Sequence, residues 1–551
     1  MLITASIVNN HSERRARLLL YVNVGMSIRR RYGQFLQANP AVFRGRPACL
    51  FTILMVGGLL LGDARRSVAA QEIPIPAQET SILAEGTVIA AQDTAGSAQG
   101  DQVPAVIAPD SGRACEGCPP RRVGTSLLQT TGINVIYEIA NLVRGQVTAH
   151  ITPKTWWENM QQGMVWDLDD FAVNQIGHPY QGNNYFNAGR ANGLSFYESA
   201  AVTAFGSATW EFFGETNHAS LNDFINTTLG GITLGEMFHR TGWLIRNTQA
   251  TGKRRLWSEI GAMAVDPITG ANRFASGDAS RVTDKPSEFV PSSLSGVAAA
   301  GMLWRGTQAS AFTAAPDPFL EVDAYYGDTN VGRSRTPYDA FFMRLRFGGG
   351  SSFSEARVRG RLYGQPLGKG GLEFLVLQTY NYQNNDAYAT GSQAIDAGLG
   401  ATRALSRRTN FWILGWGGLT VLGAVDSLPL GVTEKPEEGE PSAGQGVSEG
   451  PRFYDYGPGS DFGTLARLTR DGREFLLFNY IGRQIYSLDG VRANHFLQHT
   501  RVDVLLPLRG ALGLGASAEY FHRRSYYQDA ASTIRTYHYP QVRAYLTWGN
   551  R

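Results

Sequence analysis

The stretch EARVRGRLY, Glu355–Tyr363, alternates small or apolar residues with three arginines. Successive side chains of a β-strand point to opposite faces, so a strand of this sequence has one apolar face and one basic face. A soluble sandwich, which buries its apolar face and exposes the other, also fits the pattern. Three arginines in a row on one face, however, are typical of the polar lumen of a membrane barrel.

The rest of the C-terminal half repeats this alternation. If the first strand rises from the periplasm, each connection after an even strand should be a short periplasmic turn. The turns SRRT, RDG and RG follow strands six, eight and ten, whereas the long insertion 431–459 follows strand seven. A sandwich does not require this order, so 291–551 is predicted to form an antiparallel transmembrane β-barrel of about 12 strands. The candidate strands begin near Val297, Phe319, Phe341, Ala356, Leu372, Ala394, Phe411, Phe462, Phe475, Phe496, Leu512 and Val542.

The overall charge and composition narrow the class of protein. Lys and Arg total 50 against 47 Asp and Glu, so no broad basic field indicates a nucleic-acid partner. The chain also has 64 glycines, 11% aromatic residues and 3 cysteines. This mixture is more typical of a bacterial β-rich envelope protein than of a cytosolic α/β enzyme.

The N-terminal region has the features of an export signal. Basic residues precede the apolar run Cys49–Gly62, and the small residues Val68 and Ala70 follow it. We therefore predict that 1–70 is a signal segment, removed after Ala70. The run is shorter than the roughly 20 residues that a membrane span needs. A retained inner-membrane anchor stays open as the alternative, because Arg65 and Arg66 follow the run.

A flexible periplasmic tether is predicted over 71–150, because much of this stretch is rich in Ala, Gln, Gly and Pro. After signal removal the chain keeps Cys115 and Cys118, in C-x-x-C spacing. A zinc site needs further ligands, and a thioredoxin-like site needs a βαβ context. A disulfide that closes a small loop in an oxidising compartment is therefore the favoured interpretation.

The hydrophobic period becomes helical in the block 151–290. One helix is predicted from Ser195 to Gly214, and a second begins at Ser220, in S-x-x-D spacing with Asp223. Small residues on both helices indicate a tightly packed hairpin. The predicted fold class is thus α+β, with a compact α-helical block before the barrel. We expect the block to plug the lumen or to cap it from the periplasm.

Four motifs of this block resemble a bacterial envelope family classed only as a domain of unknown function. They are WDLDDFAVNQIGHPYQG, WEFFGE, NDFINTTLGGITLGE and WSEIGAMAVDPITGANR, and the resemblance runs over about Trp156–Arg273. It implies an exported Gram-negative protein whose helical block precedes an outer-membrane-like β region, and it implies no particular reaction. The residues it marks are Asp169, Asp170, Asn174, His178, Tyr180, Gln181, Gly182, Asn187, Glu211, Glu215, Asp223, Asn226, Gly231 and Glu236.

Three interpretations of these residues stay open. In the first, the block is a lipid-modifying hydrolase: His178 is the base, Glu211 or Glu215 orients it, and Ser195 or Ser199 supplies a hydroxyl. The substrate would then be an outer-membrane lipid or a lipopolysaccharide acyl chain.

The second interpretation is a di-iron carboxylate site. Glu215-x-x-His218 and Glu236-x-x-His239 have the spacing of such sites, with Glu198 and Glu211 as further ligands. Glu215, however, follows the point where its helix ends, so we expect the geometry to fail. No metal ligand and no cofactor are assigned.

The third interpretation is structural. Glu211 and Glu215 would bond orphan backbone amides or pair with Arg190 and Arg240. His178 would close a helix, because the residue before a proline avoids the α region. Asp223 would cap a helix and Asn226 would crosslink helices. The residues assigned to a ligand-binding site or polar network are Asp170, Asn174, Tyr180, Gln181, Asn187, Asp223, Asn226 and Glu236.

Together these patterns predict a protein of the outer membrane with a periplasmic tether. Its role is structural, or the passage of a solute or lipid, with membrane lipid and a small solute or lipid as partners. A lipid-modifying hydrolase that uses His178, Glu211 and Glu215 is the alternative, and the sequence leaves open whether the protein is an enzyme. A soluble periplasmic binding protein is the remaining class, which membrane fractionation would distinguish.

Overall fold

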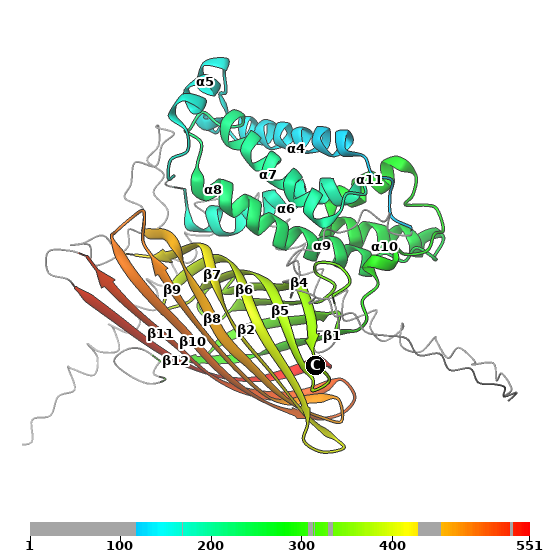
Figure 1. The fold of residues 1–551 in the computed structure, drawn as a ribbon, viewed down its shortest axis with the longest axis vertical. Helices are drawn as coiled ribbons and strands as arrows, with labels where there is room; N and C mark the ends of the chain where they lie inside the picture. Colours follow the sequence, from blue (N-terminus) through cyan, green and yellow to red (C-terminus); the bar gives the residue numbers. More distant parts are fainter. Residues whose placement is uncertain are drawn as a thin grey trace, which may run out of the picture. The chain divides into compact units, whose positions relative to one another are not determined.

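The computed structural model describes residues 117–167, 169–306, 312, 315–328, 334–427, 453–528 and 533–550. The chain divides into Met1–Val56 and Gly57–Arg551, and every described residue belongs to the second unit. The predicted signal segment and most of the predicted tether lie outside the described residues. An α-helical block is followed by a closed antiparallel β-barrel (Figure 1).

Twelve strands form the barrel, and β1 pairs with β12 to close it. All twelve predicted starting points fall inside these strands, so the predicted barrel is confirmed. The long insertion is shorter than predicted, because β8 already begins at Tyr454. The strands are β1 (Leu294–Arg305), β2 (Asp317–Tyr326), β3 (Phe341–Gly348), β4 (Glu355–Leu367), β5 (Leu372–Asn384), β6 (Ala389–Ala404), β7 (Thr409–Asp426), β8 (Tyr454–Arg470), β9 (Arg473–Tyr486), β10 (Ala493–Pro507), β11 (Leu512–Tyr527) and β12 (Ile534–Asn550).

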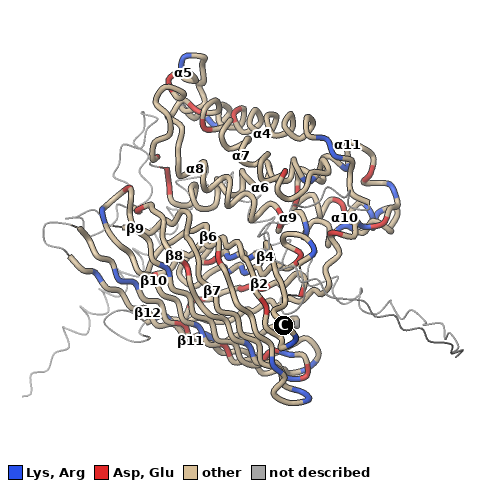
Figure 2. Tube along the Cα trace, viewed as in Figure 1, with Lys and Arg blue, Asp and Glu red and all other residues tan. Residues whose placement is uncertain are grey.

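Charged side chains meet across the lumen. Glu321 on β2 lies 2.8 Å from Arg501 on β10 and 3.0 Å from Arg543 on β12. Arg346 on β3 contacts Glu519 on β11 at 3.0 Å. Because these strands are not neighbours in the sheet, the contacts cross the interior. Acidic and basic residues accordingly occur together along the strands (Figure 2).

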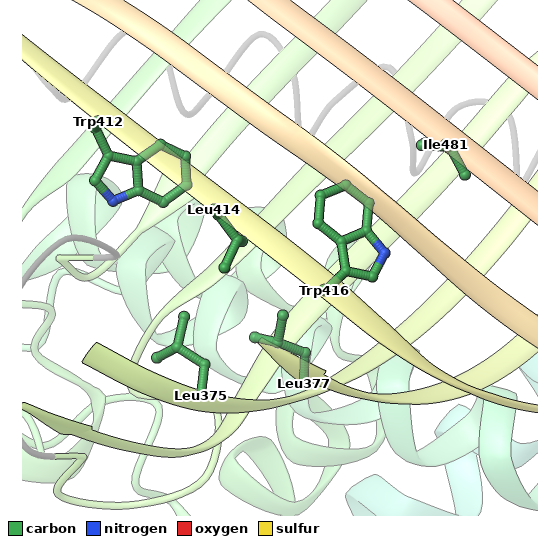
Figure 3. Close-up of a cluster of buried hydrophobic side chains, with 6 residues drawn as sticks. All are labelled: Leu375, Leu377, Trp412, Leu414, Trp416 and Ile481. Atoms are coloured by element: carbon green, nitrogen blue, oxygen red, sulfur yellow. The ribbon is translucent and has the colours of Figure 1, made fainter. Parts of the chain in front are cut away.

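Apolar side chains fill further levels of the same lumen. Trp412, Leu414 and Trp416 of β7 pack with leucines of β5 and with Ile481 of β9 (Figure 3). A second cluster joins Tyr388 and Val425 to Phe521 of β11. Arg357 hydrogen-bonds Asn381 and Arg361 pairs with Asp339, so the arginines of the opening stretch are engaged by partners. The lumen at these levels is therefore packed with side chains.

The helical block contains more helix than the sequence predicts. Helix α4 lies within the segment predicted to be a tether. That prediction is therefore wrong over Val123–Val143. Cys118 is disulfide-bonded, which agrees with the predicted disulfide, and Cys115 lies outside the described residues. The helices are α4 (Val123–Val143), α5 (Pro153–Gln162), α6 (His178–Ala191), α7 (Phe196–Phe213), α8 (Leu221–Ile225), α9 (Gly231–Ile245), α10 (Gly252–Val265) and α11 (Pro267–Ser276). Two π-helical turns, η2 (Val173–Gly177) and η3 (Asn226–Gly230), lead into α6 and α9.

Serines begin the two predicted helices, as expected. Ser195 and Glu198 form a complete capping box at the start of α7. The Ser220 hydroxyl accepts a hydrogen bond from the Asp223 amide at the start of α8. The Ser220 amide, which the Asp223 side chain would bind in a capping box, donates instead to Glu211 at 2.8 Å, so the predicted capping role of Asp223 is wrong.

The closest helix packing lies between α6 and the η3–α9 run. A Cβ atom on Gly182 would lie 1.8 Å from the Thr227 carbonyl oxygen, and one on Gly231 would lie 2.5 Å from the backbone of Gly182. The prediction that small residues bring helices together is therefore correct for Gly231. Its partner, however, is α6 rather than α7.

The helical block contacts the outer wall of the barrel. Tyr380 of β5 donates a hydrogen bond to the Gln175 carbonyl at 2.6 Å, and Gln175 donates to the Tyr456 hydroxyl of β8 at 3.1 Å. Tyr380 and Tyr456 alternate with the lumen residues Asn381 and Asp455, so they point outward. Since these contacts lie on the outer wall, the expectation that the block plugs or caps the lumen is wrong.

Two exposed surfaces of the protein are apolar. Leu506, Leu514 and Leu546 are paired across β10, β11 and β12, and they are 57%, 45% and 54% exposed. Helix α4 has a second such surface, whose members are Leu128, Val135, Ile136, Ile139, Leu142 and Val143. The opposite side of α4 is buried and mixed, with the polar Ser126 and Thr130 beside Ile133, which packs against Tyr185 and Ala188. Among the described residues, no helix is both long and apolar enough to cross a membrane.

Candidate functional site

His178 lies within a continuous helical run, which corrects the prediction that it closes a helix. Its backbone is α-helical, with φ −61° and ψ −47°. The π turn η2 precedes it, and π turns insert an extra residue into a helix, often at functional sites. The wider turn accommodates Pro179 without ending the helix. The second run, α8–η3–α9, also contains a π turn next to the same site.

Three helices each contribute one side chain to a buried cluster. One ligand atom each from His178 of α6, Glu211 of α7 and Asp223 of α8 lie within 4.8 Å of one another. The His178 Nε2 and Asp223 Oδ1 atoms are 3.4 Å apart. The three residues are 6%, 4% and 4% exposed. We call these three residues the acidic centre.

Hydrogen bonds orient each member of the acidic centre. A Glu211 oxygen accepts from the Ser220 amide at 2.8 Å, and Asp223 Oδ1 accepts from Asn222 at 3.0 Å. The Nδ1 atom of His178 lies 3.2 Å from the Thr227 hydroxyl. The opposite ring nitrogen, Nε2, is buried without a hydrogen bond.

A run of aspartates leads from the surface toward the acidic centre. Asp169 and Asp170 are exposed and Asp167 is half-buried. Asn222 donates to Asp167 at 2.6 Å and also to Asp223, so it bridges the two carboxylates. Desolvation of its carboxyl group and the neighbouring Asp167 and Asp170 raise the pKa of Asp169 to about 7.

Burial sets the protonation of the acidic centre. It raises the pKa of Glu211 and that of Asp223 well above their usual range, and neighbouring carboxylates add to both effects. Burial also lowers the pKa of His178 to about 4. The imidazole is therefore neutral near pH 7 and can accept a proton or bind a metal ion.

Among the described residues, the carboxylates of the acidic centre have no lysine or arginine partner. Within the described part of the chain, no Lys or Arg lies at ion-pair distance from Glu211, Glu215 or Asp223. Glu215 is half-buried and accepts a hydrogen bond from the Trp210 indole at 2.9 Å. Burial and the charge of Asp169 raise the pKa of Glu215.

A second buried cluster contrasts with the first because its charges are balanced. Glu236 lies 2.9 Å from Arg190 and 2.7 Å from Arg240. Glu288 lies 2.6 Å from Arg190. The predicted pairing of Glu211 and Glu215 with these arginines is therefore wrong, since Glu236 and Glu288 are the acids that they pair with.

The structure does not assemble the di-iron ligands. His218 is exposed and lies outside the helices, as the position of Gly214 predicts. His239 contacts Asp266 at 3.0 Å, and Glu236 belongs to the arginine cluster. Glu198 caps α7 and pairs with Arg121. These side chains therefore serve separate local networks.

The other predicted site residues are dispersed. Asn174 donates to the Tyr454 hydroxyl of the barrel wall at 2.9 Å, and Gln181 donates to the Tyr185 hydroxyl at 2.6 Å. Asn187 donates to Asn183 at 2.8 Å. The Tyr180 ring packs edge-on against Phe238. Asn226 is buried, and neither polar atom of its side chain has a hydrogen bond, so its crosslinking role is wrong.

Sequence reasoning missed Asp167, Asn222 and Thr227, which contact the acidic centre or lead to it. Asp167 belongs to the same D-x-D-D run as Asp169 and Asp170, so the sequence offered the same reason to select it as to select Asp169. Asn222 and Thr227 had none, because an amide or hydroxyl on a helix is common. For the hydrolase interpretation, Ser195 is already engaged as a cap.

Comparison with known proteins supports the motif resemblance. The model of the family described as Domain of unknown function (DUF3943) matches residues 163–268. No curated protein matches the chain.

Several solved membrane barrels are similar to part of the chain. The NanC porin is 8% identical, with coverage of 46% of this chain and 98% of that chain and a TM-score of 0.22. The Pseudomonas putida toluene transporter TodX is 8% identical, covers 48% and 90%, and has a TM-score of 0.19. The outer membrane protease OmpT of Escherichia coli is 7% identical, covers 47% and 97%, and has a TM-score of 0.16. These values are too low to transfer an activity.

Proposed function

We propose that the protein is an outer-membrane barrel that acts as an anchor and holds its helical block beside the barrel wall, in contact with lipid. The observation that carries this proposal is the exposed apolar row Leu506, Leu514 and Leu546 on the outside of a barrel whose lumen is charged. Transmembrane barrels have an apolar outer band, and a large exposed apolar surface is unfavourable in water.

Helix α4 supports lipid contact by the helical block. Its exposed residues Leu128, Ile136 and Val143 are apolar, whereas Ser126 and Thr130 face the block interior. A helix in water shows the opposite arrangement, with its polar side exposed. Helices at a lipid surface bury their apolar side in it. Helix α4 therefore presents a large apolar side outward, as contact with lipid requires.

The membrane proposal predicts a position-dependent effect of charge. Leu546→Arg places a cation in the exposed apolar row, which lies close to the β10–β11 turn, and should destabilise the inserted barrel by about 1–2 kcal/mol, between the costs at the interface and at the midplane. Leu405→Arg is the matched control, because Leu405 is equally exposed but lies in the β6–β7 turn. Thermal melting after reconstitution in vesicles measures both. Equal effects, or wild-type protein that stays soluble without detergent, would contradict the proposal.

The packed lumen supports an anchoring role over open passage of a solute. Arg501, Glu321 and Arg543 pair across the interior, and Trp412 and Trp416 pack at another level. We expect the protein to give no steady conductance in a planar lipid bilayer. A stable open current from the purified, folded protein would favour the passage role instead.

A lipid-modifying hydrolase is the second candidate. The observation that favours it is the geometry: His178 lies 3.4 Å from Asp223 and close to Glu211, as a base beside orienting carboxylates would, and α4 of the same block has an apolar outer side. His178→Ala should then abolish a change in lipid composition, measured by mass spectrometry of outer membranes, while the amount of folded barrel is unchanged. Loss of the folded protein with no specific lipid change would favour a structural role of His178.

A further inference from the structure

We propose that His178, Glu211 and Asp223 bind one divalent transition-metal ion where α6, α7 and α8 meet. The proposal goes beyond anchoring and does not depend on it. Its first basis is geometric, because one ligand atom from each residue lies within 4.8 Å of the others. An ion with bonds of about 2.1 Å holds its ligands about 3.4–4.2 Å apart, so small side-chain rotations suffice.

The second basis is the unpartnered nitrogen of His178. Its Nε2 atom is buried, makes no hydrogen bond and lies 3.4 Å from an Asp223 oxygen. If Nδ1 carries the proton and donates it to the Thr227 hydroxyl, Nε2 presents a lone pair to the two carboxylates. Histidines that bind metals are oriented in this way, by a hydrogen bond from the other ring nitrogen.

The third basis is charge. Glu211 and Asp223 are buried with Glu215 nearby, and the described residues offer these acids no Lys or Arg. The arginine cluster around Glu236 shows that this block supplies guanidinium groups where carboxylates need them. A divalent ion that binds here would release the protons of Glu211 and Asp223, and its charge would then balance the two carboxylates. Exposed Asp169 and Asp170, and half-buried Asp167, attract a cation to the same place.

The donor set indicates which ions fit. One imidazole nitrogen with carboxylate oxygens suits Zn²⁺ or Mn²⁺, whereas Ca²⁺ and Mg²⁺ prefer oxygen ligands throughout. The hydrogen bonds from the Ser220 amide to Glu211 and from Asn222 to Asp223 hold the carboxylates in place. This set of oriented ligands distinguishes the centre from a surface cluster of acids.

Metal binding by the full chain in detergent tests the proposal. The protein is stripped with a chelator and titrated with Zn²⁺ alone or Mn²⁺ alone. We expect one bound ion per chain for at least one of them, measured by equilibrium dialysis and elemental analysis. Co²⁺ should give visible absorption bands that change when His178 is replaced by Gln.

The variants Glu211→Gln and Asp223→Asn keep the size of the side chains and their accepting oxygens. Because burial already favours the neutral acids, both proteins should fold, which heat-modifiable migration on gels checks. Each should bind the ion at least 10-fold more weakly. His218→Ala is the matched control, since His218 is exposed in the turn before α8. No bound ion in the wild type, or folded variants that bind like the control, would overturn the proposal.

Discussion

Replacement of Glu321 by alanine is expected to destabilise the barrel by about 3–5 kcal/mol, because it removes one carboxylate that three buried guanidinium groups share. Glu321 lies 2.7 Å from Arg346, 2.8 Å from Arg501 and 3.0 Å from Arg543. These arginines come from three different strands, so the carboxylate joins opposite sides of the lumen. The midpoint of heat-modifiable migration on gels should fall sharply.

Asp471→Asn is the control for this variant. Asp471 and Arg408 form an ion pair at 3.8 Å between two turns, and both side chains are exposed. Pairs of this kind contribute about 1 kcal/mol or less. Asn also tolerates the positive φ of 51° at this position. If the two variants melt alike, the lumen network does not stabilise the barrel.

Gly182→Ala should separate α6 from the η3–α9 run and disrupt the acidic centre. The added Cβ would lie 1.8 Å from the Thr227 carbonyl oxygen, and backbone cannot rotate away as a side chain can. Overpacking costs typically about 1–3 kcal/mol, and we expect a value at or above the upper end. Thermal unfolding followed by tryptophan fluorescence measures the effect. Trp210 lies in the helical block, where its indole donates a hydrogen bond to Glu215.

Gly132→Ala is the matched control, because Gly132 is also helical but has nothing within 4 Å of its added Cβ. Alanine favours a helix over glycine by about 1 kcal/mol, so this variant should be slightly more stable. The comparison separates the effect of close packing from that of helix propensity. Equal stability of the two variants would show that the helices do not depend on the contact.

The barrel was predictable because its signal is local. Alternation over a few residues, as in Arg357–Arg361, fixes which side chains point into the lumen, and short turns such as Asp471–Gly472 fix the order of strands. The arginine partners were not predictable, since Glu321 meets Arg501 and Arg543 only after the sheet closes.

The acidic centre was predictable only in part. The hydrolase interpretation pairs His178 with Glu211, and the structure does bring these two residues together, but Asp223 was assigned to a helix cap. The π turn before Pro179 keeps His178 in a helix, and no pattern of apolar residues shows such a turn. Arg190 and Arg240 pair with Glu236 rather than with Glu211. Tertiary packing decides which of several acids a buried arginine contacts, and the sequence does not show that packing.

The contact between Tyr380 and Gln175 has a consequence for assembly. The Tyr456 hydroxyl also accepts a hydrogen bond from Gln175 of the helical block, and Gln378 of β5 donates one to the Leu229 carbonyl of the block. Hydrocarbon offers no hydrogen bonds, so this sector of the wall is unsuited to lipid unless the block already covers it. The two parts should therefore dock before or during insertion, and a barrel produced without the block should stall at that step.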